Sequence, residues 1–88
     1  MVQFSRNPGI MWNDIANDVV ALAPASGLCF GMQDVAADVW RLIAHPTSID
    51  AICDALCSSY DVDNATCRHD VEEFLASLVD EGLVSRND

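Results

Sequence analysis

The hydrophobic positions of this chain follow two different spacings. Up to residue 32, apolar runs at residues 10–12, 19–23 and 28–32 are short and are separated by polar or Pro- and Gly-containing turns. Runs of this length that are rich in β-branched and aromatic side chains are typical of strands. Because short turns join consecutive strands in antiparallel order, this part predicts a three-stranded antiparallel sheet that ends with the strand 28–32.

Beyond Met32 the apolar positions recur at helical spacing. A first helix should begin at Gln33 or Asp34 and end at His45-Pro46, because proline cannot continue a helix. Its buried face carries Val35, Ala36, Val39, Trp40 and Ile43.

Two more helices follow. Thr47 or Ser48 should cap the second, and Asp63 should cap the third, which ends near Glu81 at Gly82. The buried stripe of the second helix consists of Ile49, Ile52, Cys53, Leu56 and Tyr60. The fold class is therefore predicted to be α+β, a three-stranded antiparallel sheet followed by three helices. Residues 1–88 should form one domain with its core at about residues 10–84.

The apolar stripe of the third helix is unusually wide. At 100° per residue its apolar positions span an arc of about 140°, whereas one flat core needs only about 100°. The excess is Leu75 and Val79, which are bordered by Arg68 and Glu72. Two interpretations stay open: this flank packs on the other helices, or it forms one wall of a groove.

Charge excludes one class of partner. The chain has 14 acidic residues, four basic ones and a formal net charge of −10. Nucleic-acid binding needs Lys and Arg to neutralise phosphates, so we expect no nucleic-acid partner, and an anionic membrane is disfavoured for the same reason. The apolar runs are too short to span a bilayer. The N-terminus has no signal-peptide pattern, so the expected location is the cytoplasm.

Several motifs together resemble one known family. They are Gly27-x-x-Phe30-Gly31-Met32-Gln33, Val39-Trp40-x-x-Ile43, Ser48-Ile49-Asp50-x-Ile52-x-x-x-Leu56, Tyr60-Asp61-Val62-Asp63 and Asp70-Val71-x-x-Phe74-Leu75-x-x-Leu78-x-x-x-Gly82-Leu83-Val84. In this order and spacing they resemble the PqqD-like family, the peptide-recognition domains of pathways for ribosomally synthesised and post-translationally modified peptides (RiPPs). Trp40 and Gly82-Leu83-Val84 look most like the stand-alone recognition proteins of lasso-peptide biosynthesis.

The resemblance implies a winged helix-turn-helix-like fold and a binding function. Its members capture the leader segment of a precursor peptide as a strand added beside the third strand and laid against the third helix. Carried over by position, the peptide-binding residues are Leu28, Cys29, Phe30, Gly31, Met32, Arg68, Val71, Leu75 and Val79. The implied partners are the leader region of the precursor and then a leader peptidase or other maturation enzymes of the pathway.

The strand 28–32 carries none of the charges that usually protect an exposed sheet edge. That absence fits a docking edge, and a homodimer formed through the edge would explain it equally well. By alternation Leu28, Phe30 and Met32 should face the core, with Cys29 and Gly31 on the other side. We therefore expect the main chain of this strand to matter more for binding than its side chains.

Cysteine and histidine allow other hypotheses. Cys53, Cys57, Cys67 and His69 can be combined into a zinc site, but they lack the tight C-x₂-C pairs of structural zinc sites. Cys67 and His69 are too close along a helix to face each other as a catalytic pair. We expect no metal, no cofactor and no enzyme activity.

Two alternative functions stay open. The size and acidity would suit an acyl or peptidyl carrier protein, although Ser48 lies in Thr-Ser-Ile-Asp and not in the Asp-Ser-Leu pattern of a phosphopantetheine site. A small zinc-binding scaffold is the other alternative.

Overall fold

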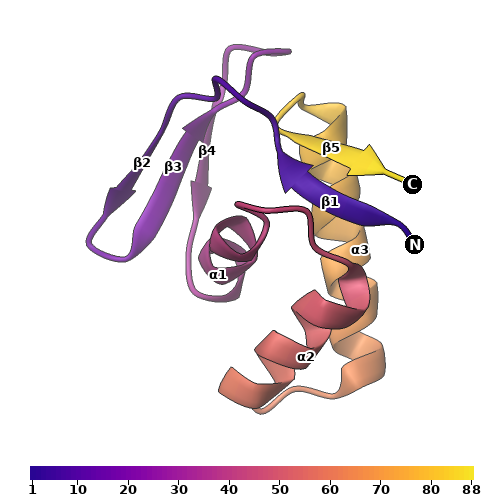
Figure 1. The fold of residues 1–88 in the computed structure, drawn as a ribbon. Coiled ribbons are helices and arrows are strands. Elements are labelled where there is room, and N and C mark those ends of the chain that lie inside the picture. The colour runs from indigo at the N-terminus through magenta and orange to yellow at the C-terminus, as the bar shows by residue number, and fades with distance from the viewer.

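The computed structural model describes all residues, Met1–Asp88, in eight elements. Along the chain they are β1 (Gln3–Arg6), β2 (Trp12–Ile15), β3 (Asp18–Leu22), β4 (Cys29–Met32), α1 (Val35–Leu42), α2 (Ile49–Ser59), α3 (Asn64–Asp80) and β5 (Val84–Asn87). Strands β2, β3 and β4 form one antiparallel sheet in that order, as Figure 1 shows. The predicted α+β fold of a three-stranded antiparallel sheet followed by three helices is confirmed.

A second, two-stranded sheet was not predicted. β1 and β5 pair antiparallel, with Phe4 opposite Arg86, and so join the two ends of the chain. The backbone of Phe4 also exchanges two hydrogen bonds with Thr47 in the α1–α2 connection, at 2.9 and 3.0 Å. The core therefore starts earlier than residue 10, because Phe4 is buried within it. The winged helix-turn-helix-like description fits this arrangement only loosely.

The first strand of the main sheet lies later than predicted. It spans Trp12–Ile15 and not residues 10–12, because the turn to β3 is made by Ala16 and Asn17 alone. Both turn residues have positive φ, 52° and 75°, as a tight two-residue hairpin turn requires. Arg41 of α1 stabilises this turn by donating hydrogen bonds to the carboxylate of Asp14 at 3.0 Å and to the carbonyl of Asn17 at 2.9 Å.

The helices begin close to their predicted residues. Ser48 caps α2 by accepting the N–H of Ala51, and Asp63 caps α3 by accepting the N–H of Thr66. Asp34 precedes α1 with φ 51°, and its side chain makes no capping hydrogen bond. α1 ends at Leu42, before the expected His45-Pro46 stop. Gly82 ends α3 with φ +77°, a conformation that favours glycine.

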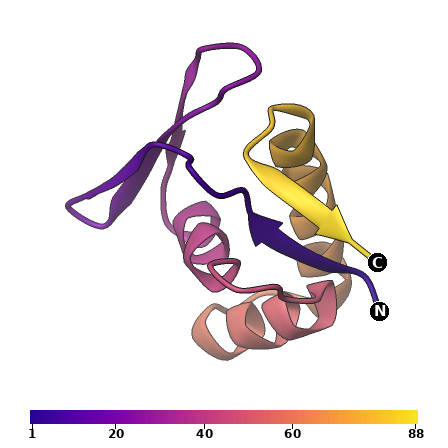
Figure 2. The same cartoon turned by 45° about the horizontal axis from the view of Figure 1, so that its top comes forward.

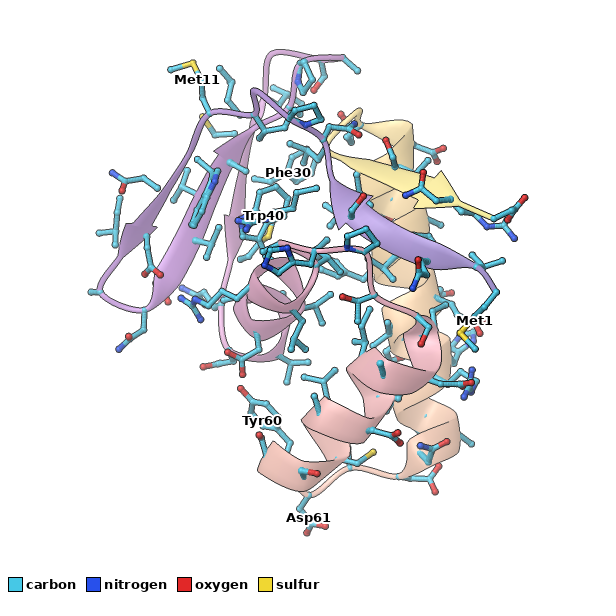
Figure 3. All side chains as sticks on the ribbon, viewed as in Figure 1. Met1, Met11, Phe30, Trp40, Tyr60 and Asp61 are labelled. Atoms are coloured by element: carbon cyan, nitrogen blue, oxygen red, sulfur yellow. The ribbon has the colours of Figure 1, made fainter.

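The core lies between the main sheet and the helices. Its 18 buried residues are all hydrophobic. Val19 and Ala21 of β3 and Met32 of β4 face α1, and Figure 3 shows Phe30 and Trp40 among the side chains that fill this space. In Figures 1 and 2 all three helices lie on one side of the β2–β3–β4 sheet. The other face of that sheet is not covered by a helix.

Candidate functional site

β4 is an edge strand. It pairs only with β3, and in Figure 1 its free edge is turned toward α3. Its four residues, Cys29–Met32, carry no charge, no proline and no bulge that would prevent pairing with another chain. We call this free side the β4 edge.

The hydrogen-bond pattern of the hairpin shows which backbone groups the β4 edge offers. The N–H of Ala23 donates to the carbonyl of Leu28 at 2.8 Å, so the backbone groups of Leu28 point toward β3. Antiparallel pairs alternate between bonded and non-bonded positions, so Phe30 also points toward β3. The N–H and C=O groups of Cys29 and Gly31 therefore point outward, where a further strand can pair with them.

The side chains of β4 mostly follow the predicted alternation. Met32 is buried and Phe30 is half-buried against the core, whereas Cys29 and Gly31 are exposed on the opposite face. The expectation that Leu28 faces the core is wrong, because its side chain is 61% exposed. Leu28 lies just before the strand begins, beyond the part of the sheet that α1 covers.

An apolar hollow of about 310 Å³ lies between α1, α2 and α3. Val35 and Ala36, which follow β4 almost directly, form one wall. Val71 and Phe74 of α3 form another, and Asp70 is the one charged residue that lines the hollow. We call this apolar space the α1–α3 hollow. A strand added at the β4 edge would direct alternate side chains toward it.

One flank of α3 carries residues that lie outside the predicted set. With Cys67 at zero and 100° per residue, Asp70, Phe74 and Glu81 lie at about −60°, −20° and −40°. Asp70 and Phe74 line the α1–α3 hollow. Glu81 accepts a hydrogen bond at 2.9 Å from Ser26 in the β3–β4 connection. This side of α3 therefore faces the α1–α3 hollow and the β3–β4 connection.

The predicted flank lies on the other side of α3. Arg68 and Val79 line a separate hollow of about 640 Å³, together with Phe4 of β1 and Ile49 of α2. Arg68 also forms an ion pair with Asp50. The structure thus places Val71 at the α1–α3 hollow and Arg68 and Val79 at the other hollow.

Leu75 belongs to neither hollow. Its side chain is fully buried and is among the largest core side chains. The wide apolar arc of α3 is explained by packing, because both α2 and β5 of the two-stranded sheet contact this helix. The role of the nine predicted residues in binding stays a prediction, and Leu75 can take part only by supporting the fold.

Sequence reasoning missed Val35, Ala36, Asp70 and Phe74 as candidate site residues. Their apolar members were read as core positions, which is what helical spacing alone indicates. One signal was present: Phe74 lies at the negative edge of the apolar arc, next to Asp70, where a buried stripe meets the exposed face. That border is where a half-open groove is found.

The cysteines of α2 and α3 meet inside the domain. The thiol of Cys67 lies against those of Cys53 and Cys57, and all are unpaired. Burial raises the pKa of Cys67 to about 11, with help from the two neighbouring thiols. A thiol with this pKa is protonated at neutral pH and is a weak nucleophile. The arrangement is typical of core packing.

The geometry can now be compared with known proteins. The family described as coenzyme PQQ synthesis protein D (PqqD) matches residues 18–84. The chain belongs to the PqqD family. The match covers β3 through the start of β5, so it includes the β4 edge and all three helices of this PqqD-family domain. No curated protein sequence matches the chain.

Two solved structures resemble this PqqD-family chain over almost its whole length. TbiB1 in complex with the TbiA(beta) leader peptide has a TM-score of 0.82 and 28% identity, covering 92% of this chain and 94% of that chain. Lasso peptide synthetase B1 complexed with the leader peptide has a TM-score of 0.75 and 27% identity, covering 93% and 96%. None of the helices in the present structure has the length and hydropathy needed to cross a membrane.

Proposed function

We propose that this PqqD-family protein binds the leader segment of a ribosomally made precursor peptide by adding it as a strand to the β4 edge. The protein then presents the leader to the enzymes of a lasso-peptide pathway. The open, uncharged β4 edge beside the α1–α3 hollow is the observation that carries the proposal. It is supported by the likeness to two leader-peptide complexes that cover more than nine-tenths of the chain.

The energetics require both the edge and the hollow. Cys29 and Gly31 offer four main-chain groups, and each hydrogen bond contributes about 1 kcal/mol net. Four such bonds correspond to an affinity of about 1 mM, before the cost of ordering the peptide. Burying one or two apolar leader side chains in the hollow adds about 1.5–3 kcal/mol each. Main-chain pairing alone therefore binds the leader only weakly, and burial of leader side chains in the hollow supplies the remaining affinity and the selectivity.

The electrostatics favour a particular kind of leader. The chain carries a net charge of −10, and Asp70 lies at the α1–α3 hollow. An acidic leader would be repelled, whereas one with basic residues beside its apolar anchors would be attracted. The partner class is therefore an apolar peptide segment that is neutral or basic.

The protein acts by binding and not by catalysis. Its buried residues are all hydrophobic, and the one cysteine with a shifted pKa is held protonated. The reacting groups must come from the leader peptidase or other maturation enzymes of the pathway. We infer that binding takes place in the cytoplasm, where the precursor is synthesised. A second copy of β4 would compete for the same edge, so a homodimer through this edge excludes the leader.

A synthetic peptide tests the proposal. It has the leader sequence encoded by a precursor gene next to the gene of this chain. We expect saturable binding in isothermal titration calorimetry, with a Kd in the micromolar range. In amide NMR spectra the largest shifts should fall on Cys29, Gly31 and the residues around Phe74. Failure of every adjacent leader to bind at millimolar concentration would rule the function out.

A pair of variants distinguishes the two sides of α3. Phe74→Ala should weaken leader binding about tenfold, because it removes apolar contact area from the α1–α3 hollow. Arg68→Ala should leave the affinity within about twofold, since Arg68 lies in the other hollow and its exposed ion pair contributes little. Calorimetry on the folded variants measures both affinities. A larger loss of leader affinity in Arg68→Ala than in Phe74→Ala would place the leader at the flank of Arg68 and Val79.

A further inference from the structure

The outer face of the β2–β3–β4 sheet is apolar and uncovered. Val19 and Ala21 point inward, so Val20 and Leu22 point outward, together with the residues paired to them. The face is an array of three rows: Met11, Leu22 and Cys29; Asn13, Val20 and Gly31; Ile15, Asp18 and Gln33. Figure 3 shows Met11 pointing away from the body of the domain.

Charge is almost absent from this face. Asp18 is its one charged residue, in the middle of the row nearest the β2–β3 turn, where it accepts a hydrogen bond from Gln33 at 3.2 Å. Met11 is 71% exposed, Ile15 55% and Leu22 37%. Although 18 of the 88 residues in the chain are charged, five of the nine on this face are hydrophobic and three others, Asn13, Gly31 and Gln33, are uncharged. An uncovered, largely uncharged sheet face that exposes apolar side chains is a candidate interaction site in a soluble protein.

The outer face continues directly into the proposed leader site. Cys29 and Gly31 form its last column, and their main-chain groups point to the β4 edge. A leader strand added there becomes a fourth column of the same sheet, with alternate side chains on this face. A protein that covers the outer face would therefore touch both the domain and the bound leader.

We propose that the outer sheet face, completed by the bound leader, is the docking surface for a second protein that has an apolar contact area bordered by basic residues. The inference rests on the proposed function, because the leader supplies the fourth column. The net charge of −10 attracts a basic protein and speeds its association.

Size and charge argue against a second copy of the chain as the occupant. Three strands by three rows cover about 14 Å by 20 Å, or about 300 Å². A stable interface buries about 800 Å² on each partner, so two such faces alone are too small. Each copy would also bring a charge of −10 to the contact. A larger, basic partner that also reaches the bound leader satisfies both requirements.

Sedimentation velocity tests this docking surface. The chain is mixed with purified proteins that are encoded by genes next to its own, each with and without the synthetic leader. We expect one of them to associate with the leader-bound chain. Leu22→Arg should weaken that association at least about tenfold, because it places a cation in the apolar contact. Ile15→Arg, at a more exposed position of the edge strand β2, should do the same in a variant that stays folded.

Ser58→Arg is the matched control, since it adds the same charge at an exposed position of α2. It should change the association by no more than about twofold, within the range of near-neutral contacts. Leader affinity should be unchanged in all three variants, because none of these residues lies at the β4 edge. Lack of leader binding by the unmodified chain would instead indicate failure of the proposed function.

Three results would overturn the docking surface although the leader binds. In the first, no protein encoded by a neighbouring gene associates with the complex. In the second, one associates, but equally well with the Leu22→Arg and Ile15→Arg variants. In the third, the chain self-associates with rising concentration and Leu22→Arg abolishes this self-association. The last result would assign the face to a second copy of the chain.

Discussion

Replacing Gly31 with proline should weaken leader binding at least about tenfold and leave the domain folded. The N–H of Gly31 points to the β4 edge, so the change removes a donor for the leader and no bond to β3. Proline is tolerated on edge strands when its N–H side faces solvent. A leader carbonyl left unpaired costs about 1–3 kcal/mol, and 1.4 kcal/mol is a factor of ten in Kd. Calorimetry with the synthetic leader, beside thermal unfolding by circular dichroism, measures both effects.

Gly31→Ala is the matched control. It keeps the N–H, and a Cβ built at this position meets no atom within 4 Å. Its affinity for the leader should therefore equal that of the unmodified chain. Phe30→Pro makes the opposite contrast, because it removes a bond to β3 and should unfold the hairpin. Equal affinities of Gly31→Pro and Gly31→Ala would show that the leader does not pair with β4.

The sequence predicted the elements whose signal is local. The hydrophobic alternation located β3 and β4, and the caps Ser48 and Asp63 located the starts of α2 and α3. The β1–β5 sheet escaped prediction because its strands have four residues each and come from opposite ends of the chain. Neither strand shows a clear alternation of buried and exposed residues, because only Phe4 in β1 and Val84 in β5 are buried. Their pairing depends on tertiary contacts that no local pattern records.

The candidate site was predictable in part, for a related reason. The β4 edge followed from strand order, since the third strand of a meander has a free side. The choice of α3 residues did not follow, because helical spacing gives the width of an apolar arc but not its rotation relative to the sheet. That rotation is set by α2 and the β1–β5 sheet, which cover Leu75 and the side of Val79. Phe74 is thereby turned toward the hollow.

Trp40→Ala should cause a large loss of stability in this domain. The side chain of Trp40, in the second half of α1, is fully buried. Its ring meets that of Trp12 edge-on, with centroids 6.0 Å apart, and the Arg6 guanidinium lies 5.3 Å from its centroid. Truncating a buried tryptophan costs about 3–5 kcal/mol. Small domains have about 5–15 kcal/mol in total, so urea unfolding should show a much lower midpoint.

Trp12→Ala is the internal comparison, because Trp12 belongs to the same cluster but is 42% exposed. It should cost clearly less, since a smaller apolar area is lost from the core. Similar costs for the two variants would mean that the contact between the rings, and not burial, dominates. A cost below about 1 kcal/mol for Trp40→Ala would contradict its placement in the core.

The destabilised variant also reports on the leader site. α1 supplies Val35 and Ala36 to the α1–α3 hollow, so loosening α1 also disturbs that wall. A ligand that binds only the folded state at 100 times its Kd stabilises it by about 2.7 kcal/mol. The leader should therefore recover most of the stability lost in Trp40→Ala, visible as a higher urea midpoint. If the leader leaves that midpoint unchanged while it binds the unmodified chain, then the packing of α1 on the sheet is itself required to form the hollow.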